Sequence, residues 1–227
     1  MPALLDDIYW IAQLEDKVYM EGDAIPLTKL MEWYMVNPNG FFLILENGER
    51  IGQLDILPIK NHDPIFKKFI EGSICEVDIP GASIASNEER IDIDELYVES
   101  VIIDSRSSYP SQPLGASHAR WCQNKNIYQA PIRYLLSNLI PIIRNITDPT
   151  SAKYIYAIAA SKAGKHLLSS LGFNIIRPAR FRKDNHDMFR LSTPLITEKI
   201  GSMIKHTTVQ DRRGFDLLLQ KAGSRGL

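Results

Sequence analysis

The chain has 227 residues, of which 44% are hydrophobic and 23% are charged. This composition is that of an ordinary globular protein, and it excludes a disordered, collagen-like or coiled-coil chain. The net charge of −1 hides a division, because residues 1–104 hold 7 Lys+Arg and 21 Asp+Glu whereas residues 105–227 hold 19 and 6. Such a charge asymmetry indicates that the protein binds charged partners, and it gives no information about the fold.

Length and cysteine content narrow the class of protein further. A chain of this size favours one compact domain, here residues 1–193, followed by a C-terminal extension at 194–227. Cys75 and Cys122 have no metal-ligand spacing and indicate a reduced, cytoplasmic protein. The first residues lack the regions of a leader, and no run of about 18 apolar residues predicts a membrane span. The oligomeric state stays open.

Two helices and a hairpin are predicted at the start of the chain. Apolar residues recur at helical spacing over 4–19, and Pro26 begins a second helix that ends before Asn37. Two apolar runs, FFLILE and RIGQLDILPI, then flank Asn47-Gly48 and predict an antiparallel hairpin. A short helix is expected at 64–70.

The segment IDIDELYVESVII, residues 91–103, alternates as a long strand does. One predicted side carries Glu95, Tyr97, Glu99, Val101 and Ile103, and the other carries Leu96, Val98, Ser100 and Ile102. Glu95 and Glu99 are therefore expected on one face, with Tyr97 between them.

The second half of the chain begins with a polar stretch, residues 105–126, that is long for a loop and is expected to be functional or mobile. The elements predicted after it are a helix at 130–146, a strand at 153–160, a helix at 161–171 closed by Gly172, and strands at 173–177 and 188–192. The whole order indicates an α+β or α/β domain with a mixed sheet.

Three blocks of the sequence, ELYVESVIID, YIYAIAA and SKAGKHLLSSLGF, resemble in this order the GNAT superfamily of acyl-CoA-dependent N-acyltransferases. The resemblance covers residues 8–192. It implies a GNAT-like mixed central sheet flanked by helices, with an acceptor-framing half at about 1–104 and a donor-binding half at about 105–193. It also implies acetyl-CoA as co-substrate and direct attack of an amine on the thioester.

The resemblance implies a carboxylate on the central strand as the base that deprotonates the amine, through water. Glu95 and Glu99 are the candidates, together with Tyr97 between them. Two carboxylates on one partly apolar face raise each other's pKa, which suits a base that works near neutrality. The alternative is that both are solvated on an exposed face.

The donor site is implied less directly, because the family's Q/R-x-x-G-x-G/A loop is altered. Gln112–Ser117 keeps the Gln and one Gly of this loop. Gln129–Leu136 has the right position relative to the predicted helix but lacks both glycines, and bulky residues there obstruct close approach of the backbone to phosphate. The resemblance implies three groups of donor-binding residues. Val101, Ile102 and Ile103 would act through their backbone N–H groups. The phosphate loop would contain either Gln129, Ile132, Arg133 and Tyr134 or Gln112 and Gly115, and Ser161 and Lys162 complete the set.

The group that protonates the departing thiolate is also altered, since Leu168 stands where many family members have Tyr. The substitutes that the sequence offers are His166, Ser169 and Tyr128. The five histidines form no i,i+4 pair and have no cysteine partner, so no metal site is predicted.

Two other functions compete with an acyltransferase. The first is a GNAT-fold binding or regulatory protein that has lost acyl transfer, as the altered loop and Leu168 suggest. The second, less favoured because no nucleic-acid-binding motif is present, is nucleic-acid binding by a basic patch. The patch comprises Arg177, Arg180, Arg182, Lys183 and Arg190, with Phe181 and Phe189 for stacking.

The acceptor is expected to be a cationic amine, either a small molecule or a protein amine. The first two helices and their connection usually frame the acceptor in this family, and here they are acidic. The residues concerned are Glu15, Asp16, Glu21, Asp23 and Glu32.

Overall fold

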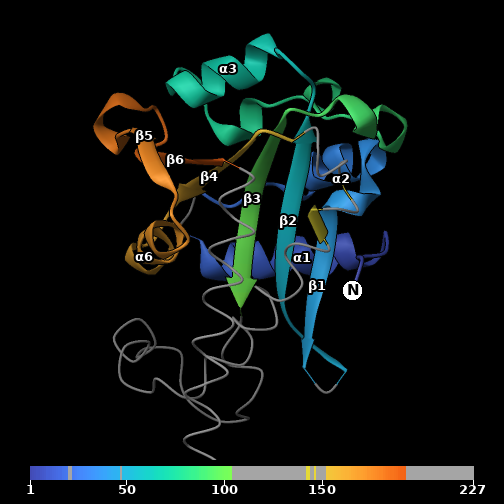
Figure 1. Ribbon diagram of the computed structural model, residues 1–227. Helices are drawn as coiled ribbons and strands as arrows, with labels where there is room; N and C mark the ends of the chain where they lie inside the picture. Colours follow the sequence, from blue (N-terminus) through green and yellow to red (C-terminus); the bar gives the residue numbers. More distant parts are fainter. Residues whose placement is uncertain (20–21, 47, 104–141, 144–145, 147–151, 193–227) are drawn as a thin grey trace, which may run out of the picture.

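The computed structural model describes residues 1–19, 22–46, 48–103, 142–143, 146 and 152–192, which build a six-stranded sheet with helices on both faces (Figure 1). The strands are β1 (Phe41–Glu46), β2 (Glu49–Ile59), β3 (Glu95–Ile103), β4 (Tyr154–Ala159), β5 (Asn174–Arg177) and β6 (Asp187–Ser192). Their order is β1-β2-β3-β4-β6-β5. The pair β3–β4 is parallel and the other pairs are antiparallel, so the predicted mixed sheet is confirmed.

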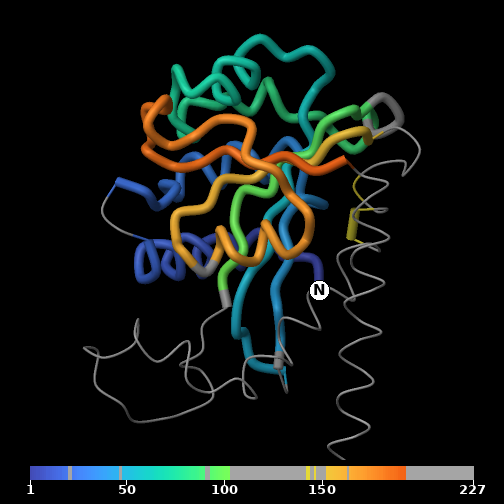
Figure 2. The backbone as a smooth tube through the Cα atoms, turned by 60° about the vertical axis from the view of Figure 1, so that its left-hand side comes forward, coloured from blue at the N-terminus to red at the C-terminus, as the bar shows by residue number. Residues whose placement is uncertain are grey.

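The helices lie on opposite faces of this sheet. They are α1 (Asp7–Val18), α2 (Leu27–Val36), α3 (Pro64–Glu71) and α6 (Lys162–Ser170), with short 3-10 turns at Pro38–Gly40, Glu76–Asp78, Gly81–Ser83, Asn87–Asp92 and Ala179–Phe181. In the tube view α6 crosses one face, while α1 lies behind the sheet (Figure 2). None of the described helices is both long and apolar enough to cross a membrane.

Each face of the sheet buries its own apolar cluster. On the side of α1, α2 and α3, the buried residues include Ile8, Ile11, Leu30, Trp33, Phe66 and Phe69, packed with Phe41, Leu57 and Tyr97 of the strands. On the side of α6, the cluster includes Leu54, Ile56, Leu96, Ile155 and Phe189, with Leu167 and Leu168 packed against it. Strands β2, β3 and β4 are thus covered on both faces and hold the central side chains in fixed places.

Several local predictions are confirmed. Strand β1 ends at Glu46 and β2 begins at Glu49, so two residues make the hairpin connection, and Gly48 has φ 84°. Pro26 is the N-cap of α2 and not its first helical residue. Gly172 closes α6 with φ 91°, as predicted from its position.

The start of β3 differs from the prediction. The strand begins at Glu95 and not at residue 91, because the preceding residues form the 3-10 turn Asn87–Asp92. That turn is stabilised by a capping box in which the Ser86 N–H donates to Glu89 Oε2 over 2.9 Å. The predicted polar stretch at 105–126 and the extension at 194–227 lie outside the described residues, as does most of the predicted helix at 130–146.

A β-bulge interrupts β3 at Glu99. Asp55 of β2 lies opposite Ser100 and Ile56 lies opposite Val98, so Glu99 has no residue facing it. Such an extra residue breaks the alternation of side chains along a strand.

The bulge changes which side chains share a face. Ser100 Oγ lies 3.2 Å from Gln53 Nε2 and 3.2 Å from the Tyr19 hydroxyl, on the α1 side. Val101 packs instead against the cluster on the α6 side. The prediction that Val101 shares a face with Glu99, and Ser100 with Val98, is therefore wrong, whereas Tyr97 and Glu99 do share a face.

Candidate functional site

Strands β3 and β4 diverge in the middle of the sheet. They pair from Glu95 to Val98 of β3 with Tyr154 to Ala157 of β4, yet β3 continues to Ile103 and β4 to Ala159. Figure 1 shows β4 turning away from β3. Beyond Val98, the edge of β3 that faces β4 has no strand partner among the described residues, which leaves backbone polar groups there for a ligand.

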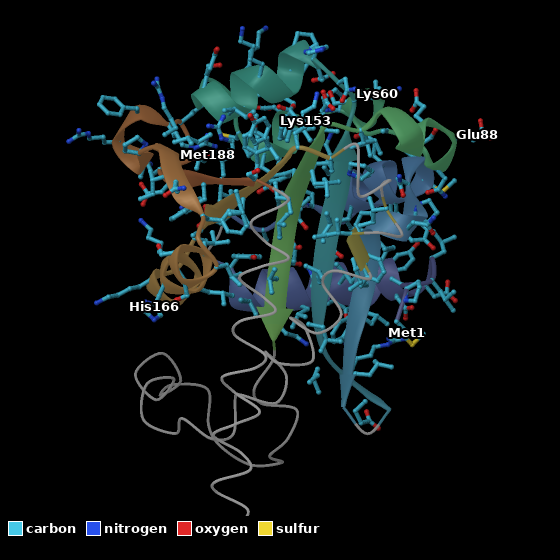
Figure 3. All side chains as sticks on the ribbon, viewed as in Figure 1. Met1, Lys60, Glu88, Lys153, His166 and Met188 are labelled. Carbon is cyan, nitrogen blue, oxygen red and sulfur yellow. The ribbon has the colours of Figure 1, made fainter. Side chains whose placement is uncertain are left out.

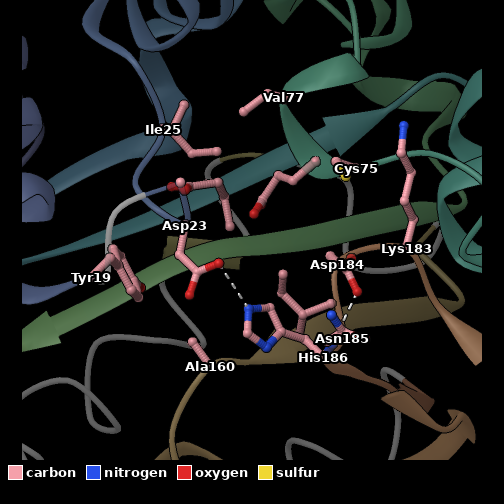
Figure 4. A pocket seen from close by; sticks show the side chains of 14 residues that line it. Tyr19, Asp23, Ile25, Cys75, Val77, Ala160, Lys183, Asp184, Asn185 and His186 are labelled. Atoms are coloured by element: carbon pink, nitrogen blue, oxygen red, sulfur yellow. Dashed lines mark hydrogen bonds and ion pairs between the residues drawn. The ribbon is translucent and has the colours of Figure 1, made fainter. Parts of the chain in front are cut away.

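A cavity of about 290 Å³ lies next to the bulge (Figure 4). Its walls come from the end of α1, the α1–α2 connection, the turn at Glu76, the middle of β3, the end of β4 and the turn before β6. The titratable side chains in these walls are Tyr19, Asp23, Cys75, Glu76, Glu99, Lys183, Asp184 and His186. The lining is therefore mixed in charge, with more acids than bases.

Three carboxyls from three elements meet behind this cavity. Glu15 of α1, Asp55 of β2 and Glu99 of β3 each place an oxygen within 4.8 Å of the others, and all three are buried. Gln53 Nε2 donates to Glu15 Oε1 over 2.9 Å and to Asp55 Oδ2 over 3.2 Å. The Ile25 N–H donates to Glu15 Oε2 over 2.9 Å.

These carboxyls bind protons more tightly than ordinary acidic side chains do. Burial raises the pKa of Glu99 well above its usual value, and the negative charges of Glu15, Glu76 and Asp55 raise it further. Burial likewise raises the pKa of Glu15 to about 7 and that of Glu76 to about 8. The distances among Glu15, Asp55 and Glu99 would also suit a cation, which the sequence did not lead us to expect.

Glu95 and Glu99 occupy different surroundings. Glu95 is half-buried, its Oε1 accepts a hydrogen bond from the Tyr156 hydroxyl over 3.0 Å, and it does not line the cavity. Glu99 follows it four positions later along the strand, a distance of about 13 Å. The expectation that the two carboxylates raise each other's pKa is wrong, because the charges that act on Glu99 come from other elements.

Tyr97 belongs to the apolar core. Its side chain is fully buried, with its ring centroid 5.1 Å from that of Phe69 and 5.9 Å from that of Phe66. Its hydroxyl influences the nearby Glu76 carboxyl, whose pKa it lowers. Its position between Glu95 and Glu99 in sequence therefore does not put it in the cavity wall.

The start of α6 has the features of a capped helix. Ser161 is the N-cap, and its Oγ accepts a hydrogen bond from the Gly164 N–H over 3.0 Å. Lys162 is exposed beside it. His166 is exposed on the same helix and points away from the sheet (Figure 3), and Ser169 is also exposed. Leu168 packs against the core.

The remaining donor candidates divide by position. Val101, Ile102 and Ile103 lie at the diverging end of β3. The candidates Gln112, Gly115, Tyr128, Gln129, Ile132, Arg133 and Tyr134 lie outside the described residues.

Of the acids predicted to frame an acceptor, two reach this site. Glu15 joins the carboxyl cluster, and Asp23 lines the cavity. Asp16 is exposed, and Glu32 pairs with Lys29 over 2.7 Å. Glu21 lies outside the described residues.

Four residues near the cavity, Gln53, Asp55, Glu76 and His186, were not predicted from the sequence as site residues. Gln53 and Asp55 could have been predicted from the sequence. They are two positions apart in the apolar run RIGQLDILPI, and side chains at that spacing in a strand lie on the same face. Glu76 and His186 could not have been predicted from periodicity, because they reach the site from turns.

The predicted basic patch is not continuous. Arg182 is buried, donates to the Phe69 carbonyl over 2.7 Å and pairs with Asp184, while Lys183 lines the cavity. Phe189 is buried in the core, so it cannot stack on a base. Arg177 and Arg180 are exposed over the ring of Phe181.

Comparison with solved structures identifies the fold. The loading GNATL domain of CurA from Lyngbya majuscula matches with a TM-score of 0.54 and 10% identity, over 86% of this chain and 96% of that domain. The GNAT-like decarboxylase GphF, in complex with isobutyryl-CoA, matches with a TM-score of 0.50 and 12% identity, over 84% and 97%. No family model matches the sequence, and neither does any curated protein. The chain has a GNAT-like α+β fold, as its sequence resemblance implied.

Proposed function

We propose that this protein transfers an acyl group, most simply acetyl, from an acyl-CoA to an amine. The observation that carries the proposal is the position of Glu99. This residue is a buried carboxyl at a β-bulge, in the wall of a cavity, next to the point where β3 and β4 diverge.

The diverging strands offer a place for the donor. Backbone N–H groups along a strand point alternately to its two edges. Those of residues 101–103 that face away from β2 are available to polarise a thioester carbonyl, since that edge of β3 has no strand partner among the described residues. The start of α6 at Ser161 and Lys162 adds a helix N-terminus and a positive charge, both of which favour phosphate groups.

The cavity offers a place for the acceptor. Its volume of about 290 Å³ corresponds to about ten water molecules, which accommodates a small amine or the end of one side chain. Asp23, Glu76 and Glu99 in its walls favour a cationic group. An ammonium in this cavity lowers the pKa of the carboxyls and so favours their ionised form, which is the form that can accept a proton.

The reaction that follows is direct attack. Ionised Glu99 accepts the proton of the ammonium through water, and the neutral nitrogen attacks the thioester carbonyl. The C–N bond forms as the C–S bond breaks, and the CoA thiolate leaves and takes up the second proton that the nitrogen loses as it becomes an amide. Because the pKa of Glu99 is raised, turnover is expected to increase with pH above neutrality.

The test combines donor binding with turnover. Isothermal titration with acetyl-CoA should show binding, and release of free CoA thiol should depend on an added amine from a broad panel. Glu99→Gln should lower kcat roughly 100-fold with donor affinity unchanged. Glu95→Gln is the matched control, since it changes a carboxylate on the same strand and face that does not line the cavity.

Other outcomes would replace the proposal. No heat at near-millimolar acetyl-CoA refutes an acyl-CoA-dependent activity. Donor binding without turnover, unaffected by either Gln variant, favours a binding or regulatory protein. Release of CO2 from malonyl-CoA without an amine would place the chain with GNAT-like decarboxylases. Retention on DNA or RNA that falls steeply with salt would favour nucleic-acid binding.

A further inference from the structure

His186 and Asp23 form a pair within the cavity (Figure 4). His186 Nε2 lies 3.5 Å from Asp23 Oδ1, and the two side chains come from the turn before β6 and from the α1–α2 connection. The His186 side chain is 17% exposed and that of Asp23 is 35% exposed, whereas Glu99 is 7% exposed. The pair is therefore closer to solvent than the carboxyl cluster.

The turn that carries His186 is fixed by several contacts. Asp184 Oδ1 accepts a hydrogen bond from the His186 N–H over 3.0 Å, and Asp184 Oδ2 pairs with Arg182 Nη2 over 2.5 Å. The Lys183 N–H donates to the Gly72 carbonyl over 2.9 Å. Asn185 has φ 57°, a left-handed conformation that persists in non-glycine residues where the surroundings enforce it. The position of the imidazole is therefore built into the fold.

The charged and titratable groups around His186 come from every wall of the cavity. They are Tyr19, Asp23, Cys75, Glu76, Glu99, Lys183 and Asp184. Asp184 is already engaged by Arg182, and Asp187, the next residue along the chain, is engaged by Lys165 over 2.6 Å. Asp23 is thus the carboxylate that pairs with the imidazole.

We propose that His186, oriented by Asp23, carries the proton that the acceptor ammonium loses from the cavity to bulk water. This inference rests on the proposed function. The ammonium gives its proton to ionised Glu99, and a cavity water passes that proton to neutral imidazole, which becomes imidazolium beside Asp23. The imidazolium then releases the proton to solvent and both groups regain their starting forms. An imidazole suits this role because it accepts and releases protons near neutral pH.

The experiment is chemical rescue. With acetyl-CoA and an accepted amine, His186→Ala should lower kcat by roughly 100-fold and leave the Kd of acetyl-CoA unchanged. Added imidazole should restore turnover in a saturable manner, which the loss of a purely structural contact would not allow. His62→Asn is the control, because it removes an exposed histidine that does not line the cavity, and asparagine tolerates the left-handed backbone at this position.

Two further variants protect the test against misfolding. His186→Gln fills a similar volume and should show the same loss of kcat, and Asp23→Asn should change the pH profile of kcat with a smaller loss. Wild-type kcat in His186→Gln, or a loss that imidazole does not restore in His186→Ala, overturns the relay while acyl transfer stands. Absence of turnover in the wild-type protein overturns the proposed function, and with it the relay.

Discussion

Gln53 Nε2 donates a hydrogen bond to Glu15 Oε1 over 2.9 Å, and this bond joins β2 to α1 behind the bulge at Glu99. The negative charge of Glu15 is the largest contribution, after burial, to the raised pKa of Glu99. A residue of α1 that does not line the cavity therefore helps to set the protonation of the proposed base on β3.

Glu15→Gln should move the acid limb of the pH–rate profile to lower pH. Without the negative charge at position 15, the pKa of Glu99 falls, so its ionised form appears at lower pH. The glutamine keeps an oxygen that can accept from Gln53. The measurement is kcat/KM for amine-dependent CoA release between pH 6 and 9.5, with Asp16→Asn, on the exposed face of α1, as control. An unchanged acid limb would show that Glu99 is not the titrating group.

The free energy of unfolding should fall as pH rises from about 5 to about 8. The usual pKa of a glutamate is 4.5, whereas folding raises that of Glu15 to about 7 and that of Glu76 to about 8. In this interval the folded protein binds more protons than the unfolded chain, so a higher pH favours unfolding. The stabilising contribution is complete below the unfolded pKa and is lost as pH passes the folded pKa values.

Thermal unfolding at a series of pH values checks this prediction. The wild-type Tm should be higher at pH 5.5 than at pH 8. Glu76→Gln should flatten the dependence, because a glutamine carries no proton that titrates. A wild-type Tm that rises over this interval, or a variant with the wild-type slope, would contradict the assignment of raised pKa values to these carboxyls.

Gly72→Ala should destabilise the protein more than Gly48→Ala. Both glycines have a left-handed backbone, with φ 80° and 84°. This conformation costs an alanine roughly 1–2 kcal/mol. At Gly48 an added Cβ meets nothing within 4 Å, whereas at Gly72 it lies 2.5 Å from Arg182 Cγ and 2.8 Å from Arg182 Cα. Urea unfolding measures the difference, and equal losses would show that Arg182 moves aside at little cost.

The sequence predicts the sheet well because the strands and their order are determined by local sequence patterns. The hairpin, the helix closed by Gly172 and the order of strands follow from periodicity and turn residues. The bulge at Glu99 could not be predicted, since it arises from the register between β2 and β3. One inserted residue moved Ser100 to the α1 side and Val101 to the other.

The site was predicted in part. The sequence indicated Glu99 and Glu95 equally as candidate bases. Their surroundings differ because acids of α1, β2 and the turn at Glu76 raise the pKa of Glu99, whereas Glu95 accepts a hydrogen bond from Tyr156. The division of charge between the two halves also needs revision. Five acids of the first half, Glu15, Asp55, Glu76, Glu95 and Glu99, have raised pKa values, so the formal charge overstates how negative that half is at neutral pH.

Chelators and divalent cations should leave the stability of the protein unchanged, although Glu15, Asp55 and Glu99 lie close enough to hold a cation. Protons already relieve the repulsion among these carboxyls, as their raised pKa values indicate. A metal ion would have to displace those protons and the hydrogen bonds from Gln53. The measurement is the Tm at pH 6, below the Glu15 pKa of about 7, with EDTA, Ca²⁺, Mn²⁺ or Zn²⁺. Asp55→Asn should raise the Tm under all these conditions, because it removes one buried acid from the cluster. A wild-type Tm that rises with one cation, and a variant that no longer responds to it, would instead identify the cluster as a metal site.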